Sequence, residues 1–244
     1  MLEPSAYRLV PSRSDPAAYD VVDRETEQLV GVATEEKVVR SDPAGGVFGS
    51  LVRRSRLFSA VAMTVAILRA CVSGVGILFG FRPHRSDGSR PRLIVRRFGD
   101  GAAVFSLQVS SGMMYESRRV DDGTGEPVAR FRSPFKTNLR AMGFGVIDLR
   151  GAEKGLNDDS RLPWLGRVCR VGDDGFSVKF VGRGDVGRVI EHGSHAGPNA
   201  GETGERPTAG CWDVDSGPQL QGDATGKILL LAAALTVAWR PPQG

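Results

Sequence analysis

Cysteine is rare and scattered in this sequence. The 244 residues include three cysteines, Cys71, Cys169 and Cys211, which lie far apart and form no CxxC pair. This usage argues against a disulfide framework and against a thiolate zinc site, and it fits a reducing compartment. The segment from Met1 to Val10 also lacks the apolar core of a signal peptide. We therefore expect a cytoplasmic protein, with membrane association left open.

Histidine is equally rare, and the motifs of common hydrolases are missing. The three histidines lie beside Gly, Pro or Ser, and no GxSxG occurs, which argues against a Ser/His/Asp triad. Glu191, His192 and His195 are neighbours, but HxxH in a Gly-rich segment does not preset zinc geometry as HExxH on a helix does. The Asp pairs 121–122, 158–159 and 173–174 are interpreted as solvated turns. The sequence predicts no enzyme, cofactor or metal site.

A dinucleotide site is also disfavoured, although residues 182–187 spell GxGxxG. Gly193, Gly197 and Pro198 follow so closely that no room remains for the helix whose N-terminus holds the pyrophosphate. We interpret the motif as a glycine-rich turn. The net charge of +4 is small and the basic residues are nearly all Arg, so nucleic acid is not an implied partner.

What the sequence does contain favours a single β-rich domain. Hydrophobic residues make up 41% and charged residues 25%, and 32 Gly and 14 Pro punctuate short apolar runs, which is typical of many strands and turns. Apolar alternation, an Asp/Gly/Glu turn and renewed alternation recur as predicted hairpins. The predicted strand segments are 19–23 with 29–32, 93–97 with 103–107, 115–120 with 128–131, 167–171 with 176–180, and a weaker 144–148.

Two segments break this rhythm. Residues 227–239 are uncharged after Lys227 and stop before Pro241; they are too short to cross a bilayer and apolar on every face, so we expect a buried helix. Residues 57–81 carry Arg69 as their one charge. We favour two packed helical pieces there, within a helical insertion over residues 50–81, and a membrane span is the alternative.

A basic cluster precedes the second of these segments. Arg53, Arg54 and Arg56 lie directly before Leu57, where each cation near an anionic leaflet is worth about 1 kcal/mol. A solvated helix start is the other interpretation. Residues 184–226 are rich in Gly, Pro, Ser and Asp, and we expect a surface loop there.

The predicted hairpins and the terminal apolar segment together resemble the tubby C-terminal-like superfamily, which includes phospholipid scramblases and LURP-one-related proteins. The resemblance is carried by residues 19–32, 93–107, 115–131, 176–180 and 229–239. It implies an antiparallel β-barrel of about twelve strands around a central C-terminal hydrophobic helix, formed by one domain over residues 1–244. It also implies binding to phosphoinositides or membranes, and in scramblases calcium-dependent lipid movement.

Some features depart from that family. Scramblases have an acidic calcium-binding segment just before the last helix, and its counterparts here are Asp213, Asp215 and Asp223. These three carboxylates are too few for the six to eight oxygen ligands that calcium takes. We therefore expect a non-enzymatic domain that binds an acidic phospholipid or membrane surface through Arg53, Arg54 and Arg56, and the resemblance implies a scramblase-like role for it. The alternative is a single-span membrane protein whose β domain is an interaction scaffold. The ligand and the oligomeric state do not follow from the sequence.

Overall fold

The computed structural model describes residues 2–12, 15, 17–38, 90–111, 116–133, 143–150, 162–192 and 210–239. The chain divides into two compact units, one of Met1–Lys37 with Pro91–Gln243 and one of Val38–Arg90 with Gly244. The first unit is a barrel. The helical insertion expected over residues 50–81 lies outside the described residues.

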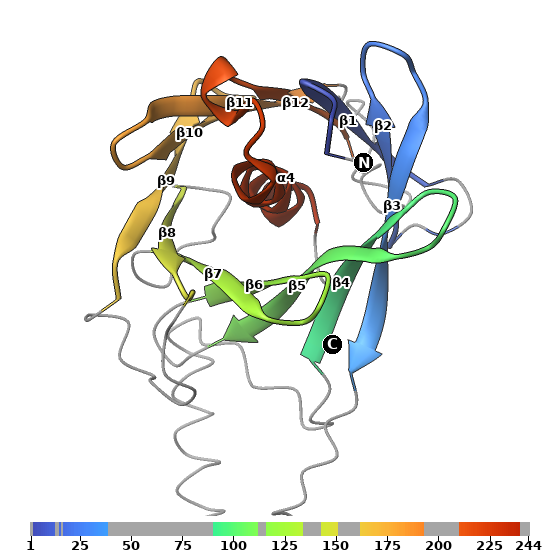
Figure 1. Cartoon of the computed structure of the whole chain (residues 1–244), viewed down its shortest axis with the longest axis horizontal. Coiled ribbons are helices and arrows are strands. Elements are labelled where there is room, and N and C mark those ends of the chain that lie inside the picture. Colours follow the sequence, from blue (N-terminus) through green and yellow to red (C-terminus); the bar gives the residue numbers. More distant parts are fainter. Residues whose placement is uncertain are drawn as a thin grey trace, which may run out of the picture. The chain divides into compact units, whose positions relative to one another are not determined.

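Twelve antiparallel strands form one closed sheet, in which strands follow one another in chain order and β1 closes the circle against β12 (Figure 1). The strands are β1 (Ala6–Pro11), β2 (Tyr19–Asp23), β3 (Leu29–Val38), β4 (Arg90–Arg97), β5 (Ala103–Ser111), β6 (Glu116–Asp122), β7 (Pro127–Arg132), β8 (Phe144–Asp148), β9 (Trp164–Val171), β10 (Gly175–Phe180), β11 (Gly184–His192) and β12 (Cys211–Ser216). Closure leaves no unpaired sheet edge. The expected antiparallel barrel is confirmed.

The helix α4 (Ala224–Ala238) runs through the inside of this barrel (Figure 1). It follows β12 through the short 3-10 helix η2 (Pro218–Leu220). Asp223 caps its start by accepting a hydrogen bond from the Gly226 N–H at 2.9 Å, as short polar residues do at the N-cap. This cap explains why the helix begins three residues before the expected Lys227.

The core consists of α4 and of the strand side chains that point inward, which alternate with side chains that point outward. Inward residues of the strands, such as Leu93, Phe105 and Phe131, are fully buried, and so are Leu230 and Leu235 of the helix. Full burial of a side chain of this size contributes about 1.5–3 kcal/mol. An apolar helix that would be insoluble alone is stabilised here because strands surround it on every side, which confirms the predicted central helix.

The two ends of the barrel are distinguished by the direction of α4. We call the end where α4 begins the entry end and the end where it finishes the exit end. At the exit end the Tyr19 hydroxyl donates to the Ala238 carbonyl at 2.9 Å, and β3 ends and β4 begins there. At the entry end the Lys227 ammonium lies against the backbone of Leu2 to Pro4.

One expectation about the chain is wrong in its main part. Residues 184–226, expected to be a loop, contribute β11, β12, η2 and the first residues of α4; residues 193–209 lie outside the described part. Gly187 serves packing, because a Cβ there would lie 2.8 Å from the Leu230 methyl groups and 2.6 Å from the Asp215 carbonyl. Glycine in β11 thus lets α4 approach the sheet. Glycine in a strand gives the sequence a composition like that of a loop, which is why this segment was expected to be one.

Candidate functional site

Arginines gather on the outer surface of the barrel over β4 to β9. Their neighbours in sequence, among them Leu93, Val120 and Val168, point into the core, so the arginines point outward because strand residues alternate. We call this set the arginine wall; it consists of Arg92, Arg119, Arg130, Arg132 and Arg167.

The strand register brings these arginines together in two adjacent rows. One row runs from Arg92 through Gln108 and Arg119 to Arg130, each directly opposite the next. The other runs from Arg132 through Gly145 to Arg167. With strands about 4.8 Å apart, the first row spans about 15 Å. Five cationic positions thus share one face.

Two of these arginines have polar partners within the same face. Asp121 accepts from Arg119 Nε at 2.5 Å, and Arg92 donates to the Ser106 hydroxyl at 2.9 Å. Arg119 and Arg130 are direct cross-strand partners, an arrangement of like charges that costs stability. A surface that accepts this cost is suited to an anionic partner.

The opposite side of the barrel differs, because its cations are matched by carboxylates. Arg8 Nε lies 2.8 Å from Asp213 Oδ1, and His192 Nε2 lies 3.0 Å from Asp213 Oδ2. Arg24 reaches Asp213 at 3.5 Å and Asp215 at 2.7 Å. These pairs lie on the outer faces of β1, β11 and β12 and in the turn after β2.

Asp213 is the centre of this second cluster, and its side chain is 4% exposed although it points outward. Burial by itself raises the pKa of Asp213, but the hydrogen bond from Arg8 and the charges of Arg8, Arg24 and His192 outweigh burial and hold this pKa below its usual value. Asp213 is therefore a fixed negative charge that orients the groups around it.

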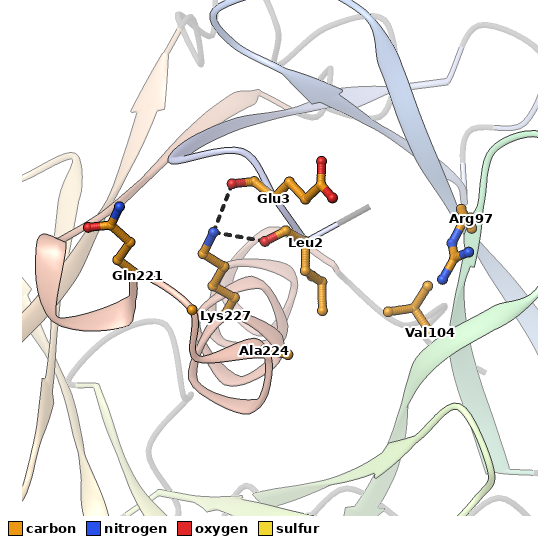
Figure 2. A pocket seen from close by; sticks show the side chains of 8 residues that line it. Leu2, Glu3, Arg97, Val104, Gln221, Ala224 and Lys227 are labelled. Atoms are coloured by element: carbon orange, nitrogen blue, oxygen red, sulfur yellow. Dashed lines mark hydrogen bonds between the residues drawn. The ribbon is translucent and has the colours of Figure 1, made fainter.

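A pocket of about 490 Å³ opens at the entry end, between the start of α4 and the β4–β5 hairpin (Figure 2). Its lining residues are Leu2, Glu3, Arg97, Val104, Gln221, Gly222, Ala224 and Lys227. Lys227 Nζ donates to the carbonyls of Leu2, Glu3 and Pro4 at 2.8, 2.9 and 3.1 Å, and Arg97 pairs with Asp100. Both cations of this pocket, Arg97 and Lys227, thus have partners within the chain.

The residues singled out from the sequence are placed as follows. Arg53, Arg54 and Arg56 lie outside the described residues, as does His195. The candidate calcium ligands do not converge: Asp213 and Asp215 point outward from β12 and pair with arginines, whereas Asp223 caps α4. Among the described residues no group of three or more His, Cys, Asp or Glu is arranged to hold a metal.

Two smaller interpretations from sequence are also resolved. The GxGxxG motif at 182–187 forms the turn between β10 and β11, with Gly182 and Gly184 at positive φ, and the start of β11. The interpretation of Asp121–Asp122 as a solvated turn is wrong for Asp121, which is buried at the end of β6. The arginine wall was missed because its members come from four strands, and their alternation with apolar residues was the one available signal.

Comparisons of the chain with models of protein families, with curated proteins and with solved structures give no match. Among the helices that the described residues form, none has both the length and the hydropathy of a membrane span. Kinship with the tubby-like superfamily therefore stays a prediction from sequence.

Proposed function

We propose that this chain is a non-enzymatic domain that binds acidic phospholipid at a membrane surface through the arginine wall. The observation that carries the proposal is the register of β4 to β9, which collects Arg92, Arg119, Arg130, Arg132 and Arg167 on one face. Guanidinium groups form paired hydrogen bonds with phosphate. A broad cationic face fits a charged surface better than it fits one small ligand.

The fold supports the same proposal. A twelve-stranded barrel closed around an apolar C-terminal helix is the architecture that the tubby-like resemblance requires, and members of that superfamily associate with lipids. We limit the proposal to binding and leave lipid transport out, because Asp213, Asp215 and Asp223 are engaged within the chain.

The expected affinity follows from the charges. Each arginine near an anionic leaflet is worth about 1 kcal/mol, so five arginines offset by Asp121 give at most about 4 kcal/mol, which corresponds to a dissociation constant of about 1 mM or weaker. If Arg53, Arg54 and Arg56 reach the same surface, about 3 kcal/mol more brings the constant to about 10 µM. Binding is therefore expected to be peripheral, and salt should weaken it.

Vesicle flotation tests the proposal. The full chain is mixed with phosphatidylcholine vesicles or with mixed phosphatidylcholine–phosphatidylserine vesicles, and the bound fraction is measured at low and high salt. We expect binding to the mixed vesicles alone. The double variant Arg130→Gln/Arg167→Gln should lose about 2 kcal/mol, which is roughly a 30-fold weaker partition.

A matched control removes the same charge elsewhere. Arg170 and Arg188 are exposed and lie outside the wall, so Arg170→Gln/Arg188→Gln should bind as the unmodified chain does, and denaturant unfolding confirms that both double variants fold. Equal loss in both, or no flotation of the unmodified chain, contradicts the proposal. Vesicle binding that resists alkaline carbonate would favour a span over residues 57–81 instead.

A further inference from the structure

A thiol, an imidazole and a buried carboxylate come together on the outer faces of β11 and β12, away from the arginine wall. Cys211 lies directly opposite His192 in the register of these strands. Asp213 follows Cys211 by two residues on the same strand, so both point to the same face. The His192 Nε2 atom lies 3.0 Å from Asp213 Oδ2. The three side chains therefore leave one outer face from neighbouring positions, and the imidazole of His192 contacts the carboxylate of Asp213.

We propose that Cys211 is a reactive thiol that exchanges with anionic low-molecular-weight disulfides, with His192 as its proton acceptor and Asp213 as the residue that positions His192. When His192 acts as the base, its proton lies on Nε2, which faces Asp213 at 3.0 Å, and the Nδ1 lone pair accepts the Cys211 proton. A nucleophile beside a base that a third group orients is the common arrangement of activated side chains.

The charges around the cluster define the class of disulfide. Arg8 and Arg24 hold Asp213 and are 39% and 41% exposed, so each keeps donors for an incoming carboxylate. The Arg8 pKa is raised mainly by its hydrogen bond and charge interaction with Asp213, and Cys211 contributes in the same direction, which places the Arg8 cation within electrostatic reach of the sulfur. A disulfide that carries carboxylates, such as oxidised glutathione, fits this setting.

The exchange balances without a further reactant. The Cys211 sulfur attacks one sulfur of the disulfide, the Cys211 proton passes to His192, and a new S–S bond forms as the old one breaks. The leaving thiolate takes the electron pair of the broken bond and then the proton from His192. The chain thiol is oxidised, and half of the small disulfide is reduced to its thiol.

The chain contains its own control in Cys169. This cysteine also points outward, from β9, and has an intermediate exposure like that of Cys211. Its register partner is Ser177, and β11, which carries His192, lies two strands away in the barrel order. Arg167 precedes Cys169 by two residues, so both thiols have an arginine near them, whereas the imidazole and the buried carboxylate belong to Cys211.

The test uses the full chain with Cys71→Ser and oxidised glutathione as the probe, near neutral pH. Peptide mass spectrometry follows the mixed disulfide at Cys211 and at Cys169 over time. We expect Cys211 to react at least about tenfold faster in the folded chain, a threshold set below the roughly 10²–10⁴-fold that general-base catalysis contributes, and we expect the ratio to fall to about one in urea. This comparison needs no change at the cluster.

A variant then separates chemistry from exposure. His192 is half exposed, so His192→Gln should fold, and it should bring the Cys211 rate down to that of Cys169 without changing the Cys169 rate. Equal rates at the two cysteines in the folded chain overturn the proposal. So does a His192→Gln variant that keeps the fast rate, because exposure alone would then explain the reactivity.

Discussion

Lys227 offers the sharpest test of how the barrel holds its N-terminal segment. Its residue is 7% exposed, and its ammonium donates to three consecutive backbone carbonyls, those of Leu2, Glu3 and Pro4. These bonds attach the start of the chain to the start of α4. We expect Lys227→Met, which keeps most of the side-chain volume, to destabilise the protein and to release this segment.

The magnitude follows from the bonds. A hydrogen bond to a charged group contributes about 1.5–3 kcal/mol net. The three bonds of Lys227 share one charge, and the freed carbonyls can reach water once Leu2 to Pro4 detach, so we expect a total loss of about 2–3 kcal/mol rather than three times the single value. In urea this loss corresponds to a midpoint lower by about 1 M.

Two measurements check this prediction. Urea unfolding followed by the fluorescence of the buried Trp212 and Trp239 gives the stability, and hydrogen exchange at residues 3–6 reports release of the segment. Lys179→Met is the matched control, because Lys179 is 44% exposed and pairs with Asp185 at 3.7 Å, a contact worth about 0–1 kcal/mol. If both variants unfold at the same urea concentration, the attachment by Lys227 is refuted.

Two further predictions concern buried polar groups. The Tyr7 hydroxyl has no hydrogen-bond partner in the described structure, so Tyr7→Phe should leave thermal stability unchanged or raise it. Tyr19→Phe loses the hydrogen bond to Ala238 and should cost about 1 kcal/mol of stability. A Tyr7→Phe variant less stable than Tyr19→Phe would contradict this prediction. The pKa of Asp213 is lowered in the folded state. The contribution of Asp213 to the free energy of unfolding is therefore complete above the pKa of the unfolded state and is lost as the pH falls below about 4. Asp213→Asn should therefore be less stable than the unmodified protein near neutral pH and should lose less stability on acidification. Urea titrations at two pH values measure this difference. Equal losses of stability in the two proteins on acidification would refute the contribution of the Asp213 charge.

Local patterns in the sequence were sufficient for much of the fold. The Asp100–Gly101 turn, with Gly101 at positive φ, lies between two clearly alternating segments, and β4 and β5 were predicted from it. The uncharged run after Lys227 was sufficient to predict a buried helix. Each of these features is encoded by neighbours in the sequence.

The parts that were missed depend on contacts between distant segments. The β11 strand has glycine where α4 passes close to the sheet, so it does not show strong alternation, and β1 and β12 were missed as well. The arginine wall and the cluster at Asp213 both depend on register, which the sequence does not state. One residue of slip would turn Arg130 inward and separate His192 from Cys211.

The position of α4 after all twelve strands has a consequence for biosynthesis. Every strand leaves the ribosome before the element that fills the barrel does, and β1 must wait for β12 before the circle closes. A nascent chain that has not yet released residues 224–238 carries inward-facing side chains with nothing to pack against, and such chains are prone to aggregate. Truncations that remove only the C-terminal residues should therefore destabilise the protein more than the number of lost residues suggests, because they remove α4 and leave the strands without the helix that they pack against.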